Sequence, residues 1–261
     1  MNREKMMPIF IKNLLFDTWN FFINQILNIV LFSITSAIIS GLIGYAFLPT
    51  LEEMSSLTNI ISNFNESISN MQYLFKNLSN DQKYILFKLS VSSHLSSLIG
   101  NAFLFSNIVL MIYNICNKKY STFYQLILNA FPFFPKFLTL IFLVSFLVQF
   151  GIAFMIVPGI FLLIIFSFSP ILISNKKIGI IYAMRTSMHH ALLHTRLIAP
   201  IIILWLFLKL IILITVSQIF IYSHLISIKI FFYLINNIVT SYAIIYIYRL
   251  FTLSENKKNF T

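Results

Sequence analysis

Lys209 stands near the centre of an apolar stretch, WLFLKLIIL, and is the only charged residue within it. A charge in the middle of a membrane-spanning helix is costly, so such a residue is by default a candidate for function. Its ammonium could meet a substrate anion or belong to a proton pathway. No carboxylate is available in an apolar segment to pair with it, so backbone carbonyls, hydroxyls or snorkelling to the surface are the structural alternatives.

A second group of polar residues lies in the apolar segment 86–112, where Ser93, His94 and Asn101 could contact water or a headgroup. Small residues recur there every four positions, at Ser92, Ser96 and Gly100. Segment 26–48 repeats the spacing in two rows, which are Ser33, Ala37, Gly41 and Ser36, Ser40, Gly44. Rows of small residues let helices approach closely. We therefore predict packing for these rows, with a polar conduit as the alternative.

His190 and His194 are four residues apart, so on a helix they share a face and could bind a metal. The usual enzymatic arrangement adds a Glu beside the first His, which is absent here. No Asp or Glu occurs between Asp81 and Glu255. We predict histidines at a lipid headgroup surface and no metal site.

Other catalytic motifs are absent from the sequence. It contains no Gly-rich phosphate loop, no nucleophile elbow and no pair of acid–base carboxylates. Its one cysteine, Cys116, cannot form an internal disulfide. We predict no catalytic residues, no cofactor and no enzymatic activity.

The composition requires an environment other than water. Of the 261 residues 59% are hydrophobic and 10% charged, and the mean hydropathy is +0.88. A soluble domain has about 25% charged residues. The net charge of +11 does not predict nucleic-acid binding, because the basic residues are spread among short loops at the ends of apolar segments.

Six apolar segments are long enough to predict membrane spans in a single all-α domain covering residues 1–261. They are approximately 26–48, 86–112, 137–157, 160–173, 198–220 and 230–250. The first follows a basic N-terminal lead-in, and it is too long for a signal peptide and lacks a cleavage site. In the lead-in, Asp17 and Thr18 are candidates for a helix cap and Trp19 for an interfacial side chain.

The charges predict both termini in the cytoplasm of a bacterial inner membrane. With this orientation 13 of the 18 basic residues are cytoplasmic, and Glu52, Glu53, Glu66 and Asp81 lie outside. The 13 are Arg3, Lys5, Lys12, Lys118, Lys119, Lys136, Lys176, Lys177, Arg185, Arg196, Arg249, Lys257 and Lys258.

Residues 137–174 are too long for one span. A single helix would measure about 57 Å against a hydrocarbon core of about 30 Å. Basic residues flank both ends, at Lys136 and at Lys176 and Lys177, which favours an even number of crossings. We predict a helical hairpin that turns at Pro158 and Gly159. A re-entrant hairpin that does not cross fully is the alternative.

Two amphipathic segments lie between the spans. In the extracytoplasmic loop 50–83, apolar residues recur at spacings of three and four. This predicts a helix that packs on the bundle or the membrane surface, or alternatively one that docks another membrane protein or a second copy. Segment 178–196 predicts a cytoplasmic interfacial helix with basic groups near lipid phosphates.

Several stretches together resemble one family. These are DTWNFFINQ (17–25), SSLIGNAFL (96–104), LVQFGIAFMIVPGI (147–160), SPILI (169–173) and AMRTSM (183–188). In their order and spacing they are similar to the YciC-type inner-membrane proteins of enteric bacteria. That resemblance implies a helical, multi-spanning inner-membrane protein with no assigned activity and no catalytic residues to carry over. The histidines at 189, 190 and 194 depart from the family pattern.

The sequence thus leaves two functions open. The leading expectation is a non-enzymatic role in membrane or envelope maintenance through contacts with membrane lipids or proteins. The alternative is a transporter or lipid-handling protein for a small or amphiphilic substrate, motivated by Lys209, the polar groups of 86–112 and the broken hairpin.

Overall fold

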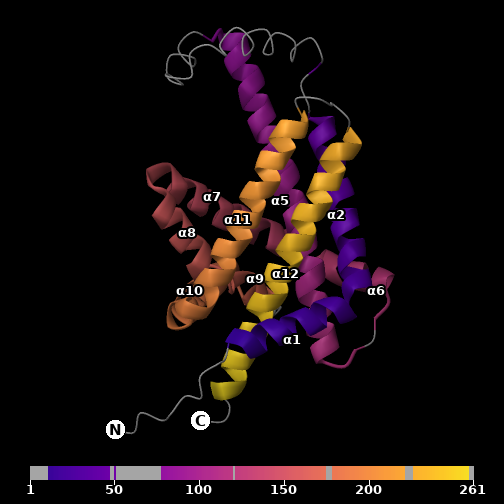
Figure 1. Cartoon of the computed structure of the whole chain (residues 1–261), viewed down its shortest axis with the longest axis vertical. Helices are drawn as coiled ribbons and strands as arrows, with labels where there is room; N and C mark the ends of the chain where they lie inside the picture. The colour runs from indigo at the N-terminus through magenta and orange to yellow at the C-terminus, as the bar shows by residue number, and fades with distance from the viewer. Residues whose placement is uncertain are drawn as a thin grey trace.

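The chain is built from helices, and several of the longest run side by side along one axis (Figure 1). The computed structural model describes residues 11–47, 50, 78–119, 121–174, 178–220 and 226–258, and these contain no strand. The helices are α1 (Ile11–Asn24), α2 (Ile26–Ala46), α5 (Asn80–Cys116), α6 (Phe123–Ala130), η1 (Phe131–Phe133), α7 (Phe134–Phe154), α8 (Ile156–Ile165), α9 (Ser169–Ile173), α10 (Ile180–Leu193), α11 (Thr195–Phe220) and α12 (Ile226–Lys258).

The number of candidate membrane spans agrees with the prediction by length and composition. The described residues include six segments that are long and apolar enough to cross a membrane. They are Ile26–Ala46, Asn80–Cys116, Phe123–Phe154, Ile156–Ile173, Thr195–Val216 and Ile228–Glu255. The protein is therefore all-α and polytopic, and its boundaries differ from the predicted ones by several residues.

Helices α2, α5 and α12 pack tightly through the predicted rows of small residues. Ser36 donates a hydrogen bond of 2.8 Å to the carbonyl of Gly100, and Ser92 donates one of 3.2 Å to the carbonyl of Gly44. A Cβ atom on Gly100 would lie 3.4 Å from the Ser36 carbonyl oxygen and would collide with the Ser40 side chain. Packing is thus confirmed as a role of these rows.

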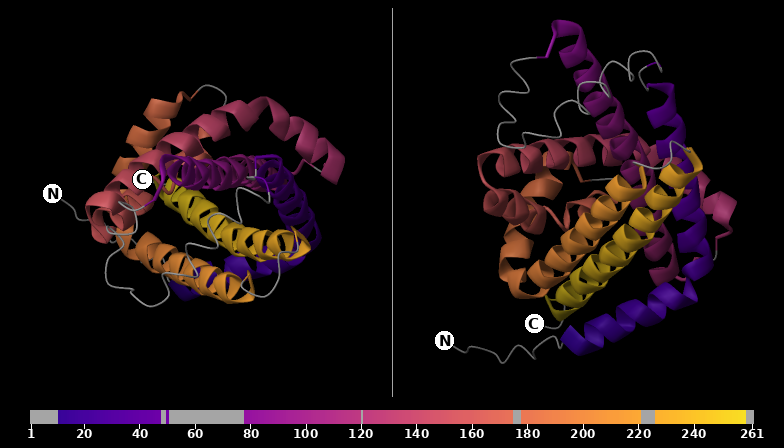
Figure 2. Two further views of the ribbon diagram at one scale, coloured as in Figure 1. Left: turned by 90° about the horizontal axis from the view of Figure 1, so that it is seen from above. Right: turned by 45° about the horizontal axis from the view of Figure 1, so that its top comes forward.

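Helix α1 lies across the end of the bundle where α12 finishes (Figure 2). Its apolar side chains Phe16 and Trp19 are exposed, as expected for a helix at a membrane surface. The predicted cap at Asp17 is wrong, because Asp17 lies in the middle of α1. Its carboxylate instead lies 3.8 Å from the guanidinium of Arg249, which also covers the Phe21 ring, so α1 is tied to α12.

The two amphipathic segments have different outcomes. A helix is confirmed within 178–196 as α10, with Ile181 and Leu193 exposed. Of the loop 50–83, residues 51–77 lie outside the described residues. Helix α5 starts within this loop, six residues before the predicted span, because Ser79 and Gln82 form a capping box.

Helices α7 and α8 form the predicted hairpin, but the predicted turn at Pro158 and Gly159 is wrong. The chain reverses at Met155, whose backbone is extended, and α8 starts at Ile156. Pro158 fits inside the first helical turn because a backbone N–H there has no intrahelical acceptor. Gly159 is needed for contact, since a Cβ atom on it would lie 3.0 Å from the backbone nitrogen of Ile152 in α7.

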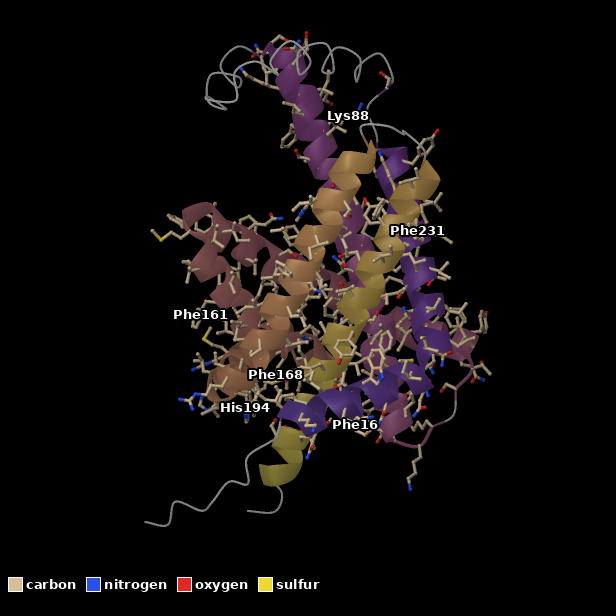
Figure 3. All side chains as sticks on the ribbon, viewed as in Figure 1. Phe16, Lys88, Phe161, Phe168, His194 and Phe231 are labelled. Atoms are coloured by element: carbon tan, nitrogen blue, oxygen red, sulfur yellow. The ribbon has the colours of Figure 1, made fainter. Side chains whose placement is uncertain are left out.

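The segment predicted as one span over 160–173 is broken between α8 and α9. Ser187 of α10 holds the break, since it donates a hydrogen bond of 2.8 Å to the Ile165 carbonyl and accepts one of 3.1 Å from the Phe168 N–H. Phe168 is fully buried and lies within the bundle (Figure 3). The hydroxyl therefore satisfies backbone groups that the broken helix leaves unpaired.

Replacing Gly159 with Ala should destabilise the hairpin, because α8 must move away from α7 to admit the Cβ atom. We expect a loss of about 1–3 kcal/mol, measured as a lower thermal midpoint in detergent. Gly179→Ala is the matched control, since a Cβ atom there meets nothing within 4 Å. Equal midpoints for the two variants would contradict the tight crossing.

Of the two alternatives for the hairpin, we predict the re-entrant one, in which the tip lies in hydrocarbon and α7 and α8 do not cross the membrane fully. Helix α8 is ten residues long, or about 15 Å, half the thickness of a bilayer core. Its apolar tip, including Phe154, Met155 and Val157, is about 70% exposed or more. In a Cys116→Ser background, we expect cysteine at Met155 to resist a membrane-impermeant maleimide, whereas cysteine at the equally exposed Tyr84 reacts. Labelling at both positions would show a tip that reaches water.

Candidate functional site

A cavity of about 940 Å³ lies between α2, α5, α11, α12 and the α7–α8 hairpin. Its size is that of a site for a small organic ligand. Most of its wall is aliphatic or aromatic, and its polar members are Tyr45, Ser92, Ser93, Lys209, Lys229, Tyr233 and Asn236. It therefore offers an apolar volume with a few polar groups, as an amphiphilic ligand requires.

The cavity opens sideways between α11 and the hairpin. Phe207 and Leu213 of α11 line it, as does Ile156 of α8, and each is more than half exposed. In a bilayer this opening faces lipid chains. A ligand could therefore reach the cavity from within the membrane.

Hydrogen bonds between helices place Lys209 near mid-depth. The bond between Ser36 and Gly100 lies at the middle of α2, and the Asn237 amide donates one of 3.1 Å to the carbonyl of Ser33. On α11, the indole N–H of Trp205 donates a hydrogen bond of 3.2 Å to the hydroxyl of Thr240. Thr240 lies one turn beyond Asn237 on α12. Lys209 lies one turn above Trp205 and so is level with the middle of α2.

The Lys209 ammonium rests on an aromatic ring. Its Nζ atom lies 4.0 Å from the centroid of the Trp205 ring. A cation over an indole face is stabilised by the ring quadrupole. Because Trp205 precedes Lys209 on α11, the side chain extends toward the start of α11 and does not snorkel to the nearer helix end. Among the described residues, no carboxylate forms an ion pair with it.

Only some of the predicted polar residues meet at this cavity. Ser93 and Lys209 both line it. His94 instead pairs with Gln149 of α7, with 3.1 Å between Nδ1 and Nε2, and Asn101 donates 3.2 Å to Ser97 within α5. His94 therefore joins α5 to α7, and the Asn101 bond stays within α5.

Other members of the site were not predicted from the sequence. Trp205 is one, although its position four residues before Lys209 already predicts a shared helix face. Tyr233 and Asn236 are the others, and with Lys229 they recur at spacings of four and three on α12. That spacing was visible in the sequence, but which face of α12 meets the cavity was not.

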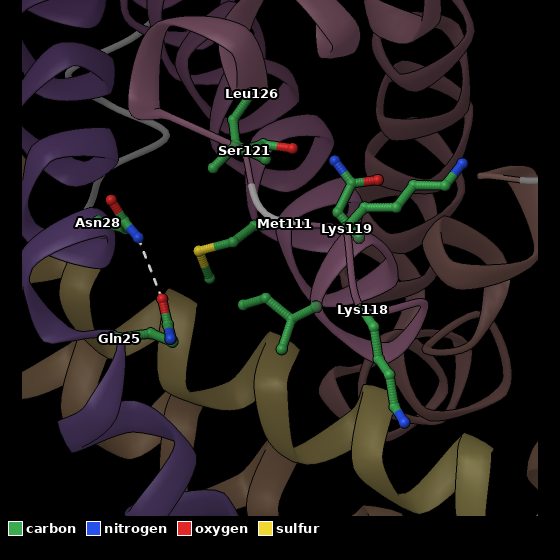
Figure 4. A pocket seen from close by; sticks show the side chains of 9 residues that line it. Gln25, Asn28, Met111, Lys118, Lys119, Ser121 and Leu126 are labelled. Atoms are coloured by element: carbon green, nitrogen blue, oxygen red, sulfur yellow. Dashed lines mark hydrogen bonds between the residues drawn. The ribbon is translucent and has the colours of Figure 1, made fainter.

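A smaller pocket of about 250 Å³ lies where α1 meets α2 and α5 ends (Figure 4). Two of its amides pair with each other, since Asn28 donates a hydrogen bond of 3.0 Å to Gln25. Figure 4 shows the side chains of Lys118 and Lys119 extending away from this pair. In the described part of the chain, no three His, Cys, Asp or Glu side chains gather to hold a metal. The large cavity is thus the stronger candidate site.

These features define a polytopic α-helical membrane protein with an intramembrane cavity. The chain belongs to the uncharacterised protein family UPF0259, whose family model matches residues 7–253. This confirms the family expected from the sequence.

The relatives are described as UPF0259 membrane proteins of bacteria. One from Wigglesworthia glossinidia brevipalpis is 58% identical over 97% of this chain and 99% of its own length. One from Sodalis glossinidius is 33% identical over 95% of this chain and 98% of its own length. One from Yersinia pestis is 31% identical over 95% of this chain and 96% of its own length. No solved structure matches this chain.

Proposed function

We propose that this protein binds an acidic amphiphile, such as an anionic phospholipid, within the membrane. One observation carries the proposal: the Lys209 ammonium lies at a large, laterally open, apolar cavity and has no described carboxylate partner. An acidic headgroup would supply the missing countercharge, and the apolar wall would contact acyl chains.

Binding is proposed in preference to catalysis because of the lining side chains. The described lining residues provide two lysines, hydroxyls and one amide, and none is a carboxylate, histidine or cysteine. Of the two functions left open by the sequence, this geometry favours lipid handling. A role in membrane maintenance would then act through the bound lipid.

The proposed location is the bacterial inner membrane with both termini in the cytoplasm. Figure 1 shows that α1, α10 and the end of α12 lie toward one end of the bundle, and most of the described basic residues belong to these segments or to the helix ends near them. They are Lys12, Lys118, Lys119, Lys136, Arg185, Arg196 and Arg249. This charge asymmetry supports placing the α1 end on the cytoplasmic side, with α1 and α10 at the lipid surface.

Quenching of Trp205 tests the proposal. The chain has two tryptophans, so Trp19→Phe leaves Trp205 as the only indole. We expect brominated phosphatidylglycerol to quench this variant saturably, and brominated phosphatidylcholine to quench it weakly. Adding Lys209→Met should weaken the response to phosphatidylglycerol about tenfold or more, because a charge-assisted contact is worth roughly 1.5–3 kcal/mol.

Lys12→Met is the matched control, since Lys12 is an exposed lysine on α1 far from the cavity. Its titration curve should equal that of the Trp19→Phe parent. Quenching that is the same for both lipids and insensitive to Lys209→Met would refute an acidic-headgroup site.

A further inference from the structure

Four polar side chains form a ladder on one face of α12. Lys229, Tyr233 and Asn236 line the cavity, and Thr240 follows at the next turn, where it accepts the Trp205 N–H. Their spacings of four, three and four keep them on one side of the helix. Eleven residues of helix measure about 17 Å, so the ladder runs from the first turn of α12, past the level of Lys209, to Thr240 at the level of Trp205.

The ladder ends in a closed wall on the α1 side of Trp205. There Ile244 and Ile245 of α12 are buried in the main core, together with Ile198 and Ile201 of α11. Tyr246 crosses between the same helices and donates a hydrogen bond of 3.0 Å to the Leu197 carbonyl. A polar headgroup at Lys209 therefore has a polar route toward one end of the bundle and a packed apolar wall toward the other.

The apolar tails of a ligand have a separate route. The sideways opening beside Phe207 and Leu213 lies along the same half of α11 as Lys209. A lipid can thus keep its chains in the bilayer while its headgroup moves along the ladder. This arrangement avoids the cost of drawing a charged headgroup through hydrocarbon.

We infer that the cavity takes its acidic lipid from one leaflet only, the leaflet at the end where α12 begins. The headgroup passes Lys229, Tyr233 and Asn236 and stops at Lys209. In the proposed orientation this is the periplasmic leaflet. The inference rests on the proposed lipid site and adds its side of entry and its closed end.

Leaflet-selective quenching tests the inference. The Trp19→Phe variant is reconstituted in vesicles and its orientation is determined by impermeant labelling of an added cysteine at Tyr84, in a Cys116→Ser background. Brominated phosphatidylglycerol is then exchanged into the outer leaflet alone. We expect quenching of Trp205 when the α12 start faces outward, and at least fivefold less in the inverted population.

A variant of the ladder gives an independent readout. Asn236→Leu should slow the onset of quenching about fivefold or more, because it removes a polar side chain from the route of the headgroup. Asn101→Leu is the matched control, because Asn101 is an intramembrane amide away from the cavity. Its rate should match the parent.

The outcomes separate the two proposals. Equal quenching from both leaflets, or an unchanged rate in Asn236→Leu, would overturn one-sided entry while leaving the lipid site intact. Quenching from neither leaflet, or quenching that Lys209→Met does not alter, would overturn the site itself and the inference with it.

Discussion

The close approach of α2 to α5 is the contact from which the other helices take their positions. Lipid chains are as apolar as the helix surfaces, so burial of apolar area alone does not drive these helices together. Small side chains permit the approach, and hydroxyls add direct bonds to the opposing backbone, as Ser36 does to the Gly100 carbonyl. Asn237 then fixes α12 on the same helix through the carbonyl of Ser33. A single small-residue helix thus sets the depth of both neighbours.

Tight packing on that side leaves the opposite side open. Helix α11 is held to α12 by hydrogen bonds at Leu197 and Trp205 in its first half, and the cavity lies beside the helix from Ile203 to Val216. The α7–α8 hairpin forms the far wall. Because Gly151 and Gly159 bring the two backbones into contact, the hairpin is a compact unit that does not collapse into the cavity.

The sequence predicted the helices well and the site only in part. Apolar length and charge placement gave six spans, and the four-residue spacing of small residues gave the α2–α5 contact. The hairpin turn was misplaced because Pro and Gly are read as turn residues, whereas here Pro158 fits a first helical turn and Gly159 meets a neighbouring backbone. Lys209 was found because an intramembrane charge is rare. The Trp205 ring was not predicted as its partner, because the partners considered for a buried ammonium were carboxylates, carbonyls and hydroxyls. Thr240 of α12 orients this indole. This contact depends on how α11 packs on α12, and no local sequence pattern specifies that packing.

The magnitudes around Lys209 explain why an aromatic ring alone is an incomplete partner. A lysine at the centre of a spanning helix costs about 2.5–3.5 kcal/mol on insertion scales. A cation–π contact contributes roughly 0.5–2 kcal/mol, depending on desolvation. The difference leaves on the order of 1–3 kcal/mol uncompensated. A phosphate oxygen at the ammonium would offset this amount, and the indole would then serve to hold the side chain in place. The same ring that lowers the cost of the charge thus also holds the ammonium at the cavity, where an anionic ligand would meet it.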